Sequence, residues 1–188
     1  MACIADGYAA LYEEDCESAI QSFGELADRE SKPKFFLHWY WRMQAELGMS
    51  DAALGKGDFS GAHQAGDRFL QSALSTADPH LQVLAWNVGT RVAMAEQDPR
   101  RGEECLKAAL AVLEKFRVPL AAWKVHQTAW QFYEHYGTKE AAAFHYAQAE
   151  AGVLAIAHSF LPEEPLRAAF LRAAPVQQIL SGRFRIVD

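Results

Sequence analysis

The sequence predicts an all-α fold: a right-handed α-solenoid of about four antiparallel helix pairs, followed by short C-terminal helices. Three observations lead to this prediction. Alternating runs of β-branched residues, which would indicate strands, do not occur. Alanine-rich blocks such as 107–111 and 140–143 favour helix, because alanine has the highest helix propensity. Signals for helix starts recur with a period of about 40 residues, which is typical of helical repeats.

The repeated signal is a residue that caps helix N-termini well, and it is followed by a fixed pattern. The caps are separated by 43, 40 and 40 residues and stand at Asp15, Asp58, Asp98 and Thr138. Four residues after each cap comes a small side chain, at Ala19, Ala62, Gly102 and Ala142. Eleven residues after each cap comes an apolar side chain, at Leu26, Phe69, Ala109 and Ala149. Each cap is therefore expected to open the second helix of a hairpin, whose small residue lets the first helix cross closely.

Prolines and glycines support the limits of these elements. Pro79 and Pro99 each follow an aspartate, which places aspartate at the N-cap and proline in the first turn. Gly182 is expected to end the last helix. The predicted helices are 2–13, 16–30, 34–54, 59–77, 79–96, 99–116, 119–136, 139–160, 163–173 and 175–181. They form repeats at 2–30, 34–77, 79–116 and 119–160 and a C-terminal cap at 163–181, in a single domain over 1–182 with a tail at 183–188.

One segment carries a family resemblance. Residues 57–62, Gly-Asp-Phe-Ser-Gly-Ala, resemble the turn and second-helix start of a tetratricopeptide repeat. Trp86 and Tyr133 stand where that repeat has large residues, and Gly7 stands at its glycine position, which Ser50, Thr90 and Trp130 occupy in the later repeats. The chain also resembles the C-terminal helical portion of large bacterial signalling proteins, through residues 119–126 and 161–176. The resemblance implies a protein-binding surface on the first helices of the repeats.

Composition and charge exclude several classes of protein. The 188 residues carry a net charge of −6, which disfavours a nucleic-acid binder with a broad basic surface. No run of 18 apolar residues and no signal peptide occur, so we expect a cytoplasmic protein that does not enter a membrane. The three cysteines, Cys3, Cys16 and Cys105, show no metal-ligand or disulfide spacing, so reduced thiols are expected.

The sequence offers no support for enzyme chemistry. The glycine-rich segment 55–61 lacks the spacing of a phosphate-binding loop and is explained by the turn between paired helices. The histidines of the fourth repeat lack the spacing of a helical zinc site, and no nucleophile motif occurs. Adjacent glutamates point about 100° apart on a helix, so they do not share a proton. We therefore expect a protein without catalytic residues, cofactors or bound metal.

Polar side chains on the first helices define a candidate groove. Arg42, Arg91 and Lys124 come from three successive first helices and are expected to converge on one concave strip. The full set of candidate groove residues is His38, Arg42, Asn87, Arg91, Lys124, Gln127 and Gln131. An ordinary solvated helix face explains the same residues, and the sequence leaves both readings open. The aromatic cluster at 35–41 likewise fits either a packed core or an aromatic wall of the groove.

These features predict a scaffold that binds another protein or a peptide segment, an acidic one if the basic strip forms. The resemblance makes the chain a module of a larger bacterial signalling or regulatory protein. One alternative is a sensor that binds a small effector in the groove, and another is a homo-oligomerisation scaffold. The first helix is apolar for a terminal one, so it is expected to form a homodimer or to continue a longer array.

Overall fold

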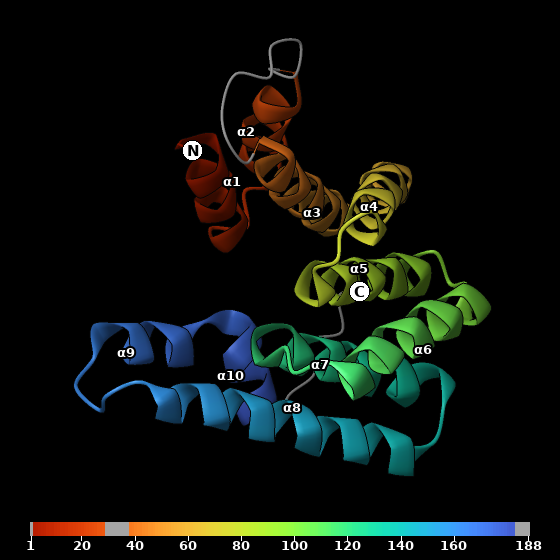
Figure 1. Cartoon of the computed structure of the whole chain (residues 1–188), viewed down its shortest axis with the longest axis vertical. Helices are drawn as coiled ribbons and strands as arrows, with labels where there is room; N and C mark the ends of the chain where they lie inside the picture. The colour runs from red at the N-terminus through yellow and green to blue at the C-terminus, as the bar shows by residue number, and fades with distance from the viewer. Residues whose placement is uncertain (1, 29–37, 183–188) are drawn as a thin grey trace. The chain divides into compact units, whose positions relative to one another are not determined.

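The structure, a computed structural model, describes residues 2–28 and 38–182, and all regular structure within these residues is helical (Figure 1). This confirms the predicted all-α class. The helices are α1 (Ala2–Tyr12), α2 (Cys16–Asp28), α3 (His38–Lys56), α4 (Phe59–Leu74), α5 (Pro79–Ala95), α6 (Pro99–Lys115), α7 (Pro119–Tyr136), α8 (Lys139–Ser159), α9 (Pro165–Arg172) and α10 (Ala174–Leu180). None of these described helices combines the length and the apolar character needed to cross a bilayer.

The four predicted helix caps are confirmed by hydrogen bonds. In each case a side-chain oxygen accepts from a backbone N–H three residues later, which satisfies one of the free donors at a helix start. The donor–acceptor distances are 3.1 Å for Asp15, 2.9 Å for Asp58, 3.0 Å for Asp98 and 3.2 Å for Thr138. Asp78 caps α5 in addition and precedes Pro79 in its first turn. The repeat pattern read from the sequence therefore corresponds to real helix starts.

The chain packs as two compact units, Met1–Ala108 and Ala109–Asp188. The first unit holds α1 to α5 and the beginning of α6, and the second holds the end of α6 and the remaining helices. Within the first unit, α1 to α4 each pack against the next helix, and α3 also contacts α1 and α5. Within the second unit, α7 and α8 form the largest contact, and α9 and α10 both pack on α8.

The small and apolar positions that follow the caps form the interior. Ala19, Ala62 and Ala142 are fully buried, and Gly102 is buried as well. The apolar positions eleven residues after the caps are also buried, at Leu26, Phe69, Ala109 and Ala149. The sequence period therefore predicts correctly which face of each second helix is covered.

In the first unit, the ring of Phe23 fills the space left by two glycines. A Cβ atom added at Gly7 on α1 would lie 2.6 Å from Cε1 of Phe23, and one added at Gly48 on α3 would collide with the same ring. Phe23 itself has no exposed surface. Tyr8 packs edge-on against it, with ring centroids 5.2 Å apart. The glycines on α1 and α3 therefore let both helices close around one aromatic side chain of α2.

In the second unit, aromatic side chains join α7 and α8 to the C-terminal helices. Trp130 of α7 packs against the ring of Tyr146 on α8, with centroids 4.9 Å apart. The Tyr146 hydroxyl donates a hydrogen bond of 3.1 Å to the carbonyl of Ile179 on α10. Ile179 and Val176 are buried in the cluster that also contains Trp123. The predicted C-terminal cap therefore covers the α7–α8 pair.

Three described helix limits differ from the predicted ones by two residues or more, and the first is the end of α3, at Lys56 rather than 54. Helix α4 ends at Leu74 rather than 77, because the hydroxyls of Ser75 and Thr76 turn back to the carbonyls of Ser72 and Ala73 at 2.6 and 2.7 Å. Helix α9 begins at Pro165 rather than 163, because Glu164 is extended and its carboxylate accepts from the N–H of Leu161. The predicted start of the third helix at 34 lies outside the described residues.

Candidate functional site

The predicted groove residues of the first unit are engaged with acidic neighbours. Arg91 on α5 pairs with Asp51 on α3, with 2.6 Å between Nη1 and Oδ1. Arg42 on α3 lies 3.7 Å from the carboxylate of Glu46 and donates to the hydroxyl of Ser72 at 3.3 Å. His38 begins α3 and is half-buried. Both arginines are thus neutralised within their own unit, which lowers their attraction for an acidic ligand.

Asn87, a further candidate of this unit, lies in the interior. Its side chain is 5% exposed, and its Oδ1 accepts no hydrogen bond from any residue that the structure describes. A buried acceptor without a donor costs about 1–3 kcal/mol of stability. A ligand would therefore reach the Asn87 amide only if the side chains that cover it moved.

The remaining candidates belong to the second unit. Lys124 on α7 is exposed, and its Nζ lies 5.7 Å from the ring centre of Trp123. Gln127 donates from Nε2 to Oε1 of Gln178 on α10 at 3.3 Å. Gln131 accepts at its backbone carbonyl from the ring of His135 at 2.9 Å. Because the candidates divide between the two units, the expected convergence of Arg42, Arg91 and Lys124 stays a prediction.

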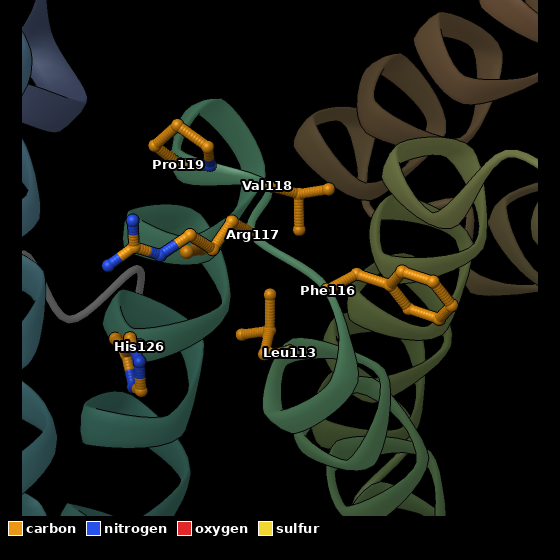
Figure 2. A pocket seen from close by; sticks show the side chains of 7 residues that line it. Leu113, Phe116, Arg117, Val118, Pro119 and His126 are labelled. Carbon is orange, nitrogen blue, oxygen red and sulfur yellow. The ribbon is translucent and has the colours of Figure 1, made fainter.

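A hollow of about 400 Å³ opens in the second unit where α6 ends and α7 begins. Its lining residues are Leu113, Phe116, Arg117, Val118, Pro119, Ala122 and His126. Figure 2 shows Arg117 and His126 on one side of the hollow and the aliphatic side chains of Leu113 and Val118 on the other. No hydrogen bond or ion pair holds the Arg117 guanidinium among the residues that the structure describes, and the residue is exposed. The hollow therefore combines an apolar wall with an available positive charge.

The local sequence explains why this hollow forms. Val118 precedes Pro119, and a residue before proline disfavours the helical conformation, so α6 cannot continue into α7. The backbone of Val118 is not helical, with φ −128° and ψ 67°, and its carbonyl accepts from the N–H groups of Ala121 and Ala122. At this turn Leu113 and Val118 are half-buried, and Phe116 and Pro119 are exposed.

His126, at the polar side of the hollow, forms a pair with His145 of α8. Their Nδ1 atoms lie 2.9 Å apart, and the rings stack with centroids 5.2 Å apart. A hydrogen bond between two Nδ1 atoms requires a proton on one of them only, so the two rings are held as opposite tautomers. His145 also stacks on the ring of Tyr133, with 6° between the planes.

Both imidazoles of this pair are held neutral at pH 7. Burial lowers the pKa of His126 to about 4, and the neighbouring His145 adds to the effect. Burial also lowers the pKa of His145. The Arg117 guanidinium is therefore the positive charge at the hollow, while His126 contributes a neutral ring that can donate or accept one hydrogen bond through Nε2.

A second polar cluster ties three helices of the first unit together. His63 of α4 lies 2.7 Å from a carboxylate oxygen of Glu96 and 3.2 Å from one of Asp67. Arg101 of α6 reaches the same two carboxylates, at 3.2 and 2.9 Å. Each acidic group thus has two basic partners, and the cluster is a structural network rather than a set of groups open to a ligand. Across the described residues, no three histidine, cysteine or acidic side chains lie together as metal ligands would.

Sequence reasoning missed Arg117, His126 and the histidine pair. Position 145 lies seven residues after its cap, where the other repeats have Ser22, Ala65 and Cys105. A histidine at a position where the other repeats have a small side chain was the signal that could have indicated the pair. Arg117 gave none, because a basic residue between two helices is ordinary in a soluble chain.

No protein-family model, no curated protein and no solved structure matches this chain.

Proposed function

We propose that the chain is a non-enzymatic helical-repeat module, a right-handed solenoid resembling tetratricopeptide repeats, that binds a segment of a partner protein. The segment carries an acidic group next to apolar side chains and occupies the hollow at residues 113–126. The observation that carries the proposal is Arg117, which pairs with no residue in the described part of the chain, beside an apolar hollow of about 400 Å³. We also propose, from the resemblance, that the module is part of a larger bacterial signalling or regulatory protein of the cytoplasm.

Contacts between alternate helices support the solenoid part of the proposal. In the first unit α3 contacts α1 and α5 besides its sequence neighbours, as stacked first helices of successive repeats do. The equivalent caps and the equivalent buried positions recur in all four predicted repeats. Each predicted repeat thus has a capped second helix with the same buried positions. The turn between α6 and α7 connects the third predicted repeat to the fourth.

The chemistry of the hollow favours a carboxylate. A guanidinium presents several N–H donors in a plane that matches the two oxygens of a carboxylate. The aliphatic wall of Leu113 and Val118 favours an apolar group next to that carboxylate, since burying apolar surface contributes about 25 cal/mol per Å². His126 stays neutral, so it does not attract an anion by charge and can only orient one.

Isothermal titration with short capped peptides tests this proposal. The probe is an acetylated, amidated peptide with one glutamate between leucines, and its control replaces the glutamate with glutamine. We expect the glutamate peptide to bind about threefold to fivefold more tightly, and Arg117→Glu to remove that difference, because one exposed charged contact contributes up to about 1 kcal/mol. Lys115→Glu, an exposed charge reversal two residues away, is the matched control and should bind as the native chain does.

Equal affinity of both peptides for the native chain would contradict the carboxylate proposal. An equal loss of peptide affinity in the Arg117→Glu and Lys115→Glu variants would show that the net charge of the chain, and not a specific site, determines binding. Both variants should keep the native helical circular dichroism, since exposed substitutions usually change stability by only about 0.5 kcal/mol.

A second candidate function is sensing of a small effector with the same chemistry. The volume of the hollow lies within the range of small-molecule sites, about 300–1,000 Å³. Hexanoate and 4-phenylbutyrate serve as probes in the same titration. If either free acid binds as tightly as the peptide, and Arg117→Glu abolishes that binding, the effector-sensing function is favoured over peptide binding.

A further inference from the structure

Helix α8 is apolar on two faces, and only one of them is covered. The covered face contains Ala142, His145, Ala149, Val153 and Ile156. The other face exposes Phe144, Ala147, Ala151 and Leu154, with Phe144 57% and Leu154 39% exposed. We propose that this outer face, called here the α8 stripe, pairs with the α8 stripe of a second copy of the chain, the two helices running antiparallel.

The other second helices show that an apolar outer face is not a property of the repeat. The positions that lie at the same distances from the cap as Phe144 and Ala147 are exposed in the other second helices, except for the half-buried Gly24, and most of them are polar. Phe144 corresponds to Gln21, Gln64 and Glu104, and Ala147 corresponds to Gly24, Asp67 and Lys107. Among the second helices that the structure describes, α8 is the one with apolar side chains at both of these positions. Exposed apolar surface of this kind marks an interaction site.

The spacing of the stripe indicates which partner fits it. Along one line of α8 stand Glu140, Phe144, Ala147, Ala151, Leu154 and His158, with steps of 4, 3, 4, 3 and 4 residues. The order of these steps is the same from either end of the helix. The side chains follow the same symmetry: the outer two are polar, the next two are large and apolar, and the inner two are alanines. Steps alternating between 3 and 4 form the straight seam along which two helices pack. A two-fold axis therefore brings Phe144 of one copy opposite Leu154 of the other, and the two small alanines face each other.

The ends of the stripe are also complementary. The same two-fold pairing places the carboxylate of Glu140 opposite the imidazole of His158, and it does so twice in the dimer. Both side chains are exposed in the single chain. The imidazole can donate an N–H to the carboxylate whether it is charged or neutral. Off the centre line, the pairing brings Glu150 next to the amide of Gln148. A parallel arrangement would instead place Glu140 against Glu140.

The size of the stripe sets the expected affinity. A helix of 21 residues is about 32 Å long, and a strip about 10 Å wide covers roughly 300 Å² on each copy. This is less than the roughly 800 Å² per partner of a standard interface. We therefore expect a reversible dimer with a dissociation constant of about 10–100 µM, populated only in concentrated solution.

Sedimentation-velocity centrifugation between about 10 and about 500 µM tests the dimer. The native chain should change from monomer to dimer across this range. Leu154→Glu should raise the dissociation constant at least about tenfold, because it buries a carboxylate in the seam. Leu74→Glu is the matched control: Leu74 lies at the same distance from its cap on α4 and is 48% exposed. It should leave the dimer unchanged.

A charge exchange tests the antiparallel pairing itself. Glu140→Lys should weaken the dimer, and the double variant Glu140→Lys with His158→Glu should restore it, because the complementary pair is then reversed. A native chain that stays monomeric up to about 500 µM would overturn the proposal. So would a dimer that Leu154→Glu leaves intact, or a double variant no tighter than Glu140→Lys. Circular dichroism should show the same helix content for all variants, since every substituted residue is exposed.

Discussion

The contact of Phe23 with Gly7 and Gly48 shows how single residues set the distance between helices. Replacing Gly48 with alanine places a methyl group against the fully buried ring of Phe23, so the ring or the helix must shift. We expect Gly48→Ala to lower the free energy of unfolding by about 1–3 kcal/mol, despite the better helix propensity of alanine. Urea unfolding followed by circular dichroism measures the change.

Gly24 is the matched control for that substitution. It also lies inside a helix, but a Cβ atom added there meets nothing within 4 Å. Gly24→Ala should therefore stabilise the chain by about 0.5–1 kcal/mol. If Gly48→Ala is equally stabilising, the close packing around Phe23 does not limit the fold.

The histidine pair makes stability depend on pH. The pKa of His126 is lowered from its ordinary value of 6.5 to about 4, so the unfolded chain binds a proton more readily than the folded one. The free energy that the neutral His126 contributes to folding is fully present above about pH 6.5, and it is lost as the pH falls toward about 4. Allowing for the part of the ring open to solvent, we expect a loss of about 1–2 kcal/mol.

The variant His126→Gln isolates this contribution, because glutamine keeps a hydrogen-bonding side chain that does not titrate. Urea unfolding at a series of pH values should give a smaller slope for the variant between about pH 6.5 and 4. Identical slopes for the two chains would show that His126 titrates normally in the folded state.

At the scale of the element, each second helix depends on its cap. Asp58 accepts from the N–H of Gly61 at 2.9 Å, at the exposed start of α4. Asp58→Ala should lower the free energy of unfolding by about 0.5–2 kcal/mol, because an N–H at the helix start loses its partner. Asp6→Ala, an exposed aspartate within α1, is the control and should change stability by only about 0.5 kcal/mol. Similar effects of the two substitutions would argue against the cap.

The elements could be predicted from sequence because their signals are local. A cap, the proline after it and a small residue one turn later act within a few residues, so Asp98 and Pro99 fix the start of α6 wherever it packs. The end of α4 was missed because the hydroxyls of Ser75 and Thr76 compete with the helix for its last carbonyls. The same sequence would also be compatible with a longer helix.

The candidate site could be predicted less well, because it depends on pairing between helices. The residue types on the first helices were identified, but their acidic neighbours were not: Arg91 and its partner Asp51 lie 40 positions apart in the chain. The pairing of His126 with His145 likewise depends on the phase of α7 against α8. Asn87 lies buried, and nothing in the local sequence distinguishes it from an exposed polar residue.

At the scale of the whole molecule, the chain presents two kinds of surface on its second unit: a hollow with a positive charge and an exposed apolar helix. The hollow lies at the α6–α7 turn, whereas the stripe runs along α8. The two proposals can thus fail separately. Loss of peptide binding in Arg117→Glu should leave the dimer unaffected, and loss of the dimer in Leu154→Glu should leave peptide binding unaffected.

The central claim is that a carboxylate with an apolar neighbour binds in the hollow at residues 113–126. The most direct measurement is a nuclear magnetic resonance titration of the native chain with the glutamate peptide, following the His126 ring and the backbone amides. We predict that resonances of His126, Arg117 and Val118 shift together and saturate, while those around the Arg91–Asp51 pair stay in place. Shifts confined to the Arg91–Asp51 region, or no saturable shift in residues 113–126, would contradict the claim.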